Sequence, residues 1–281
     1  MAVACRVMED HDTSAPRALV ETWSATAGDA IDLVSTLTED EALASTDLPG
    51  WTVHDIVAHL AHLESELAGD APVLADDTEI PVDARDDAFR AYTERGVAAR
   101  RHRPTSDLVA DLQSAVDRLR QTLAMDDPAP PPESFPRPGA TWERLLRDRV
   151  FDYWMHEQDI RRAIGREGGW DTAGALHTIA TFRAAVPYVV GKKVRPPAGT
   201  VVALTVEGDA WTDTVAVRVD DDGRARIADE VPMAPDVGLT MTVQDFVLAG
   251  GGRRDPSALD VEVTGDPALA QRVLAELVVT P

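Results

Sequence analysis

The residues of this 281-residue chain with the clearest chemical potential are a carboxylate and an imidazole four positions apart, Asp152 and His156. In an α-helix this spacing stacks two side chains on one face, one turn apart. Such a pair can supply two ligands to a divalent metal, provided that another element supplies a third. It can equally be structural, with Asp152 bridging to Arg149 and His156 donating a hydrogen bond to a neighbouring helix. The pair alone leaves both interpretations open.

A helix from about Trp142 to Gly165 must position this pair. Its apolar residues recur at helical period and define a stripe that faces the core, with Asp152 and His156 along its edge: Leu145, Leu146, Val150, Tyr153, Ile160 and Ile164. Gly165 is expected to end the helix as its C-cap. Arg149 falls inside the stripe, where an unpartnered charge is costly. We therefore predict that Arg149 is buried with a carboxylate partner, most simply Asp152 or a residue on a facing helix.

His59 is the candidate third ligand, on a helix predicted to begin after the break at residues 48–50. Thr52 is a natural N-cap, and Asp55 completes a signature like a capping box. Helical-wheel geometry places His59 beside the apolar stripe of this helix, whereas it predicts that His54 and His62 point away. A histidine at the edge of a core helix can be a hydrogen-bonded structural residue or a metal ligand inside a helical bundle.

The remaining periodicity predicts two domains. Further amphipathic helices are expected at residues 16–37, 84–101, 106–123 and 172–186, and the six prolines of residues 126–138 exclude a helix there. Together these predict an N-terminal all-α four-helix bundle over residues 12–192. After a Pro-rich hinge near residue 195, residues 196–281 predict a small α+β domain, with strands at 201–206, 214–219, 224–227 and 259–264 and helices at 242–248 and 267–277.

Charge and composition exclude several classes of partner. A formal net charge of -22 argues against nucleic acid or an anionic membrane as a partner, because both would be repelled. The sequence has no apolar run of membrane-spanning length and no signal-peptide pattern, so a soluble, cytoplasmic protein is expected. Cys5 is the single cysteine, which excludes an intramolecular disulfide and a cysteine-rich zinc site. Met8 is an alternative start, and the sequence does not define an oligomeric state.

Three stretches together carry a family resemblance. They are residues 48–60 (Leu-Pro-Gly-Trp-Thr-Val-His-Asp-Ile-Val-Ala-His-Leu), residues 154–161 (Trp-Met-His-Glu-Gln-Asp-Ile-Arg), and a tail with Gly252-Arg253 followed by residues 263–270 (Val-Thr-Gly-Asp-Pro-Ala-Leu-Ala). The chain resembles, over nearly its whole length, the mycothiol-dependent maleylpyruvate isomerase family of actinobacteria. The resemblance implies a DinB-like four-helix bundle followed by a small domain similar to sterol carrier proteins.

The resemblance also implies a metal site. A divalent metal, usually zinc, is held in that family by a histidine of the first motif and by a carboxylate and a histidine four apart on a later helix. These positions correspond to His59, Asp152 and His156. The isomerase-type triad has glutamate where this chain has Asp152, which is shorter by one methylene but remains a good oxygen ligand. Arg253 corresponds to the Gly-Arg of the tail and is a candidate catalytic residue at the domain interface, with a plain surface arginine as the alternative.

Three protein ligands leave one position of a tetrahedral zinc open, as in catalytic sites. Coordination lowers the pKa of a thiol, and because the chain places no cysteine at the site, an external thiol such as mycothiol would be the nucleophile. The expected function is a metal-dependent isomerase or thiol S-transferase acting on a small electrophile. The alternatives are a non-catalytic small-molecule-binding protein and a metal-dependent hydrolase with Asp159 or Glu157 as general base.

Overall fold

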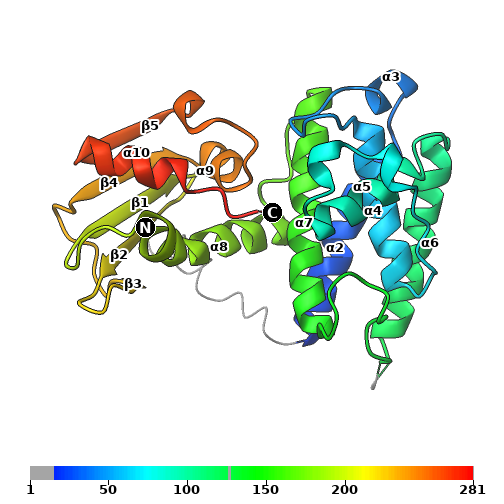
Figure 1. Cartoon of the computed structure of the whole chain (residues 1–281), viewed down its shortest axis with the longest axis horizontal. Coiled ribbons are helices and arrows are strands. Elements are labelled where there is room, and N and C mark those ends of the chain that lie inside the picture. Colours follow the sequence, from blue (N-terminus) through cyan, green and yellow to red (C-terminus); the bar gives the residue numbers. More distant parts are fainter. Residues whose placement is uncertain (1–15, 126–127, 281) are drawn as a thin grey trace. The chain divides into compact units, whose positions relative to one another are not determined.

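The computed structural model describes residues 16–125 and 128–280 (Figure 1). These residues fall into two compact units, one ending at His177 and the other beginning at Thr178. The division lies inside helix α8 (Ala173–Tyr188), whereas the sequence analysis placed it at the Pro-rich segment near residue 195. Cys5 and Met8 lie outside the described residues.

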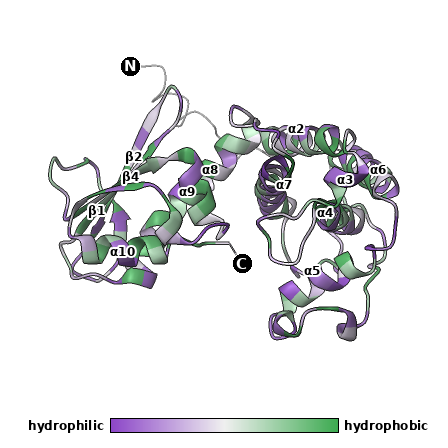
Figure 2. Cartoon of the chain, turned by 90° about the horizontal axis from the view of Figure 1, so that it is seen from above, coloured by the Kyte–Doolittle hydropathy of each residue, from purple (hydrophilic) through white to green (hydrophobic). Residues whose placement is uncertain are grey.

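Helices make up the N-terminal unit. They are α2 (Pro16–Val34), α3 (Glu39–Ala42), α4 (Val53–Leu67), α5 (Ala88–Ala98), α6 (Thr105–Leu123) and α7 (Trp142–Ile164), with short 3₁₀ turns η1 (Asp77–Glu79) and η2 (Val82–Ala84). The four long helices α2, α4, α6 and α7 surround a common centre (Figure 2). One apolar core draws on all four, with residues such as Trp23, Ile56, Leu112 and Tyr153 fully buried. This core positions α4 and α7, which carry the candidate site.

Local sequence signals determine where α4 and α7 begin and end. Thr52 and Asp55 form the predicted capping box at the start of α4. The side chain of Thr141 caps α7, and Gly165 ends it in a left-handed conformation with φ of 66°. Both helices therefore begin near the predicted residues, and α7 also ends at the predicted Gly165.

Two helical predictions need correction. The helix predicted at 84–101 is shorter, since α5 covers only Ala88–Ala98. The helix predicted to stop before Pro187 continues through it to Tyr188 and then widens into the π-helix η3 (Val189–Val194). A proline inside a helix removes one N–H donor. Here the complete burial of Val189 and Val190 offsets that loss.

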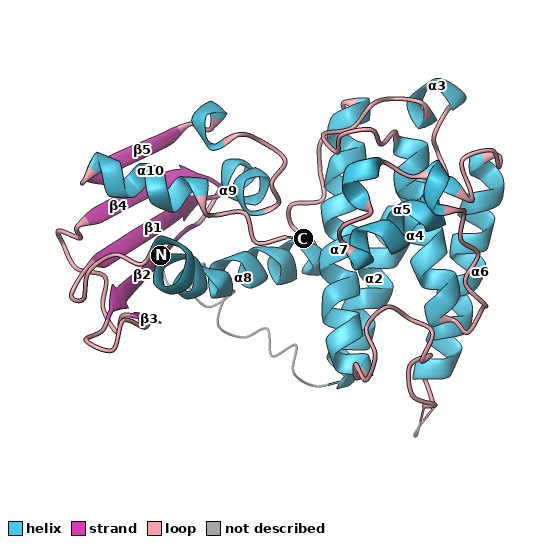
Figure 3. Ribbon diagram, viewed as in Figure 1, coloured by secondary structure: helices cyan, strands magenta, loops and turns pink. Residues whose placement is uncertain are grey.

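A five-stranded sheet dominates the C-terminal unit (Figure 3). The strands are β1 (Val201–Glu207), β2 (Thr212–Val219), β3 (Ala225–Ile227), β4 (Val237–Thr242) and β5 (Val261–Gly265), in the order β3-β2-β1-β4-β5. β1 and β4 are parallel, and the other neighbours are antiparallel. Helices α9 (Val243–Gly250) and α10 (Pro267–Ala275) contact β4, and a 3₁₀ turn η4 (Pro256–Ala258) precedes β5.

The sequence analysis missed strand β4, although its alternating residues Val237, Leu239 and Met241 are all buried. The strand runs directly into α9, and Thr242 is both its last residue and the N-cap of that helix. No turn residues separate the two elements, so no local signal marks where the strand ends and the helix begins. The prediction of a small α+β unit is otherwise consistent with the observed sheet and helices. Among the described residues, no helix has the length and apolar character that crossing a bilayer requires.

Close contact between α5 and α4 depends on Gly96. A Cβ atom at this position would lie 2.0 Å from the ring of His62, which is completely buried. We expect Gly96→Ala to lower the free energy of unfolding by about 1–3 kcal/mol, because overpacking outweighs the better helix propensity of alanine. Urea denaturation followed by circular dichroism measures this change.

Gly28 provides the matched control, since it also lies within a helix and a Cβ there would meet its nearest neighbour at 3.8 Å, an ordinary contact. Gly28→Ala should stabilise the protein by about 0.5–1 kcal/mol. Equal stabilisation by both substitutions would show that α5 does not pack tightly on α4.

Candidate metal centre

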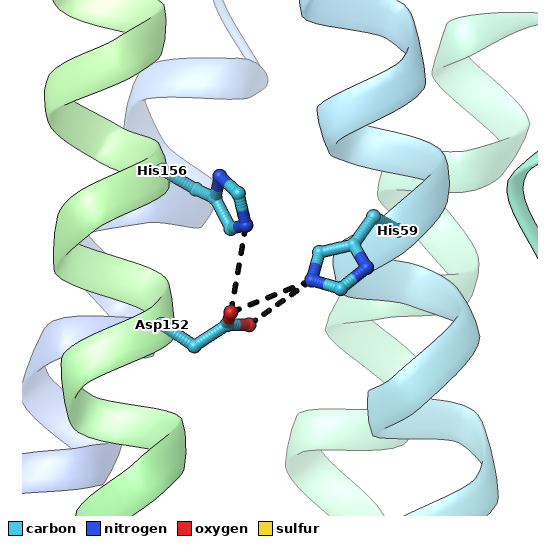
Figure 4. A group of neighbouring side chains, drawn as sticks. All are labelled: His59, Asp152 and His156. Atoms are coloured by element: carbon cyan, nitrogen blue, oxygen red, sulfur yellow. Dashed lines mark hydrogen bonds and ion pairs between the residues drawn. The ribbon is translucent and has the colours of Figure 1, made fainter. Parts of the chain in front are cut away.

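His59 from α4 and Asp152 and His156 from α7 converge in the N-terminal unit (Figure 4). One ligand atom from each of the three lies within 4.8 Å of the others. Both histidines are buried, and the Asp152 side chain is 28% exposed. The structure therefore brings together the three residues that the sequence analysis selected, and leaves the carboxylate as the most accessible of them.

The distances fit a single ion. Asp152 Oδ1 lies 3.4 Å from His156 Nε2 and 3.5 Å from His59 Nε2. Ligand atoms about 2.0–2.1 Å from a tetrahedral zinc are about 3.3 Å from one another, so the separations are close to the edges of such a tetrahedron. Two imidazole nitrogens and one carboxylate oxygen also match the donor types that zinc prefers. The residues present thus fit a divalent metal with one further coordination position.

Arg149 holds Asp152 Oδ2, an oxygen that also lies 3.2 Å from His59 Nε2. Its Nη1 donates to Asp152 Oδ2, while its Nε and Nη2 lie 3.0 and 2.9 Å from Glu64 Oε2 on α4. Arg149 is 3% exposed and Glu64 is fully buried. The prediction that Arg149 is buried with a carboxylate partner is confirmed. Glu64 was not predicted, although it occupies the apolar stripe of α4, four residues after Leu60 and three before Leu67, as Arg149 does on α7.

Charge and burial oppose each other throughout this cluster. Burial would raise the pKa of Asp152, but His59, Arg149 and His156 outweigh it and hold that pKa well below its usual value. Burial raises the pKa of Glu64 despite the opposing charge of Arg149. Burial would lower the pKa of Arg149, yet the charges of Glu64 and Asp152 raise it. Asp152 is therefore a carboxylate and Arg149 a cation at neutral pH.

The two histidines differ in their surroundings. Burial lowers the pKa of His59 even though Asp152 opposes this. Burial acts in the same direction on His156, but the carboxylates of Asp152 and Asp159 outweigh it and raise the pKa. His156 Nδ1 lies 3.2 Å from Asp159 Oδ2, whereas the buried His59 Nδ1 has no hydrogen-bond partner within residues 16–125 and 128–280.

Trp51 forms an aromatic wall beside the two imidazoles. Its ring centroid lies 5.3 Å from that of His59 and 6.2 Å from that of His156. The Trp51 and His156 rings are stacked. The indole Nε1 donates to Glu94 Oε1 of α5 at 3.0 Å, which fixes the orientation of the wall. The sequence analysis quoted Trp51 within the first motif but assigned it no role.

The prediction that His54 and His62 point away from the core is wrong. His54 is 9% exposed with Nδ1 2.8 Å from Thr105 Oγ1, and His62 is fully buried, with its ring 5.1 Å from that of Tyr92. A two-sided helical wheel fails here because α5 and α6 both pack on α4. Burial lowers the pKa of His62 to about 3, so its imidazole is neutral near pH 7.

Arg253 lies in the C-terminal unit, just after α9. It is partly buried, and its Nη1 donates to the carbonyl oxygen of Gly251 at 2.6 Å. Its catalytic role stays a prediction.

The buried ion pair yields a stability prediction. Arg149→Met keeps most of the side-chain volume but leaves the buried Glu64 carboxylate without its partner, so we expect a loss of about 3–5 kcal/mol in the free energy of unfolding. Adding Glu64→Gln should recover part of that loss, because it removes the stranded charge. Chemical denaturation of the single and double variants measures both values.

Arg144 on the same helix is a matched control. It is exposed and pairs with Asp148 at 3.2 Å, so Arg144→Met should cost no more than about 1 kcal/mol. If Arg149→Met and Arg144→Met cost the same, the Arg149–Glu64 pair contributes little to stability.

Comparison with solved structures and curated proteins gives the following matches. The chain is similar to the crystal structure of the mycothiol-dependent maleylpyruvate isomerase, with 14% identity, a TM-score of 0.49, and coverage of 89% of this chain and 92% of the other. A histidine-to-alanine variant of that isomerase gives 14% identity and a TM-score of 0.49 over 90% of this chain and 96% of the other. Sterol carrier protein 2 like 2 from Aedes aegypti is 24% identical over 34% of this chain and 89% of its own, with a TM-score of 0.25. No curated protein matches the chain.

Family profiles match most of the chain. The Mycothiol maleylpyruvate isomerase N-terminal domain matches residues 23–161, a range that includes His59, Asp152 and His156. The MDMPI C-terminal domain matches residues 177–272. The two matches follow each other in the order of the two structural units. The chain belongs to the mycothiol maleylpyruvate isomerase family.

Proposed function

We propose that this protein is a metal-dependent enzyme that uses mycothiol, as an isomerase or a thiol S-transferase, on a small electrophilic substrate. The observation that carries the proposal is the grouping of His59, Asp152 and His156 within 4.8 Å in a chain of this family. We further propose a cytoplasmic location, and that the four long helices form a DinB-like bundle followed by a sterol-carrier-like domain.

Two imidazoles and a carboxylate would hold a divalent ion, with zinc as the best candidate from the donor types. When bound, such an ion supplies Lewis acidity that keeps an incoming thiol ionised at neutral pH. The single cysteine, Cys5, lies outside the described residues, and we propose that the thiol comes from outside the chain. A low-molecular-weight thiol therefore fits the requirement as cosubstrate or cofactor.

The surrounding residues prepare the site for that reaction. Arg149 donates to Asp152 Oδ2 and so fixes a carboxylate whose two oxygens both contact His59 Nε2 and whose Oδ1 also faces His156. Trp51 presents an aromatic surface beside the imidazoles, which suits an apolar or conjugated part of a ligand. We propose that Arg253 of the C-terminal unit contributes a positive charge for an anionic substrate group.

The hydrolase alternative needs a carboxylate base close to the site. Glu157 is bound by Arg161 Nε at 2.7 Å, and Asp159 contacts His156 Nδ1 and Arg162. Both candidate bases thus have cationic or imidazole partners, which favours the thiol mechanism. A non-catalytic binding protein is the other alternative, and metal content distinguishes it.

Metal analysis tests the site directly. The purified protein should contain close to one divalent metal per chain, and His59→Ala and His156→Ala should each lose most of it, because two ligands hold a divalent ion much more weakly than three. Inductively coupled plasma mass spectrometry after dialysis gives the stoichiometry.

His62→Ala and His102→Ala are the controls, and both should keep the metal. His62 does not belong to the group of three ligands and packs against the Tyr92 ring, so its substitution should cost stability only. His102 is exposed, and its substitution should change neither property. Full metal retention in both His59→Ala and His156→Ala would remove the site from this proposal.

A thiol titration tests the chemistry. Adding mycothiol to cobalt-substituted protein should produce a thiolate-to-cobalt charge-transfer band in the near ultraviolet, because a thiol that reaches the ion is held ionised. Activity toward an electrophile should require both metal and added thiol. Cys5→Ser should leave the band and the activity unchanged, because the nucleophile is external.

A cobalt protein that shows no band at saturating mycothiol, yet changes its spectrum with another added ligand such as azide, would contradict the thiol mechanism. That result would favour the hydrolase or the binding-protein alternative.

A further inference from the structure

We propose that Asp159 is the positioning residue that fixes the tautomer and ring orientation of His156, so that the unprotonated Nε2 faces Asp152 and His59. This inference rests on the proposed metal-dependent function. It adds a residue that the metal-site grouping does not include and that acts only through His156.

The His156 ring lies between two carboxylates of its own helix. Nε2 is 3.4 Å from Asp152 Oδ1, and Nδ1 is 3.2 Å from Asp159 Oδ2. Both carboxylates can only accept, but the Nδ1 contact with Asp159 is a hydrogen bond, whereas the longer Nε2 contact with Asp152 is only an ion-pair distance. The Nδ1 position therefore carries the proton, and Asp159 accepts it. A neutral imidazole has one N–H, which leaves the lone pair on Nε2. The contact with Asp159 thereby selects the tautomer that a metal ligand requires.

Asp159 is itself fixed. Its side chain is completely buried, and Arg162 Nη2 donates to Oδ1, the oxygen that does not face His156. Arg162 Nε in turn donates to Asp47 Oδ2 at 2.6 Å, in the segment that leads to Trp51 and α4. The two oxygens of Asp159 therefore have separate partners, one a donor-only guanidinium and the other an imidazole.

His59 lacks a comparable arrangement, because its buried Nδ1 has no hydrogen-bond partner among the described residues. Its ring instead packs 5.3 Å from that of Trp51, and its Nε2 contacts Asp152 at 3.2 Å. Of the two imidazoles, only that of His156 therefore has a carboxylate at Nδ1.

This geometry gives Asp159→Asn a specific consequence. Arginine has no acceptor, so the carbonyl oxygen of an asparagine must face Arg162 and its NH₂ group must face His156 Nδ1. Nδ1 then has to accept, and the proton moves to Nε2, where it blocks the metal position. We expect zinc affinity to fall about 10–100-fold, as for other partners that orient a metal-binding histidine.

The experiment measures two properties, the tautomer of His156 and the affinity of the protein for zinc. Long-range ¹⁵N–¹H spectra of metal-free, histidine-labelled protein, recorded above the titration range of histidine, should show protonated Nδ1 at His156 in the wild type and protonated Nε2 in Asp159→Asn. Competition with a chelating dye gives the zinc Kd of each form. Asp148→Asn is the matched control, since it makes the same change on the same helix at a carboxylate bound to Arg144, and it should alter neither readout.

The outcomes separate this inference from the proposed function. A wild-type protein that carries the proton on Nε2 of His156 overturns the inference without any variant, so a failure of Asp159→Asn to fold does not protect it. Zinc binding by the wild type together with unchanged affinity and tautomer in Asp159→Asn also overturns it. A wild type with the Nδ1–H tautomer that binds no divalent metal supports the role of Asp159 while contradicting the metal-dependent function.

Discussion

The buried ion pair between Arg149 of α7 and Glu64 of α4 is the interaction on which the candidate site depends. Its two charged groups are almost without solvent contact, with 3% and 0% exposure. Taking both out of water costs several kcal/mol per ion, and their attraction offsets this only when the geometry is good and the remaining hydrogen bonds are satisfied. The pair therefore constrains the register of α4 against α7 more than its neighbouring apolar contacts do, because a shift by one turn would leave two charges buried alone. That register brings His59 of α4 to Asp152 of α7.

The same arginine links the ion pair to the ligand set. Arg149 donates through Nη1 to Asp152 Oδ2, which also lies 3.2 Å from His59 Nε2, while Oδ1 lies 3.4 Å from His156 Nε2. The aspartate thus reaches both imidazoles. Its carboxylate keeps its charge although burial opposes this, because His59, Arg149 and His156 hold the pKa of Asp152 well below its usual value.

The sequence predicted the part of this cluster that lies on α7, where polar residues interrupt or border a helical pattern of apolar residues. Arg149 in the apolar stripe indicated a buried partner, and the four-residue spacing indicated a shared face for Asp152 and His156. Glu64 is likewise a charged residue in the apolar stripe of α4, which indicates a buried partner, but it was not predicted. The burial of His54 and His62 was not predictable from one helix, since it depends on α5 and α6, which pack on α4 from other sides. Strand β4 and the helical Pro187 likewise depend on tertiary packing that overrides local signals.

Helix α5 explains why polar groups so close to the ligands are buried at all. It is short, and Gly96 lets it approach the ring of His62, while its Glu94 binds the Trp51 indole on the side of the imidazoles. Glu94 is 6% exposed and Arg101 Nη2 lies 4.0 Å from it, so the wall rests on a largely buried carboxylate. One element thus closes α4 from solvent and orients the aromatic surface next to the candidate metal ligands. The Trp51 ring and the Asp152 carboxylate, which Arg149 fixes, both contact His59. These contacts position the imidazole although its Nδ1 has no hydrogen-bond partner among the described residues.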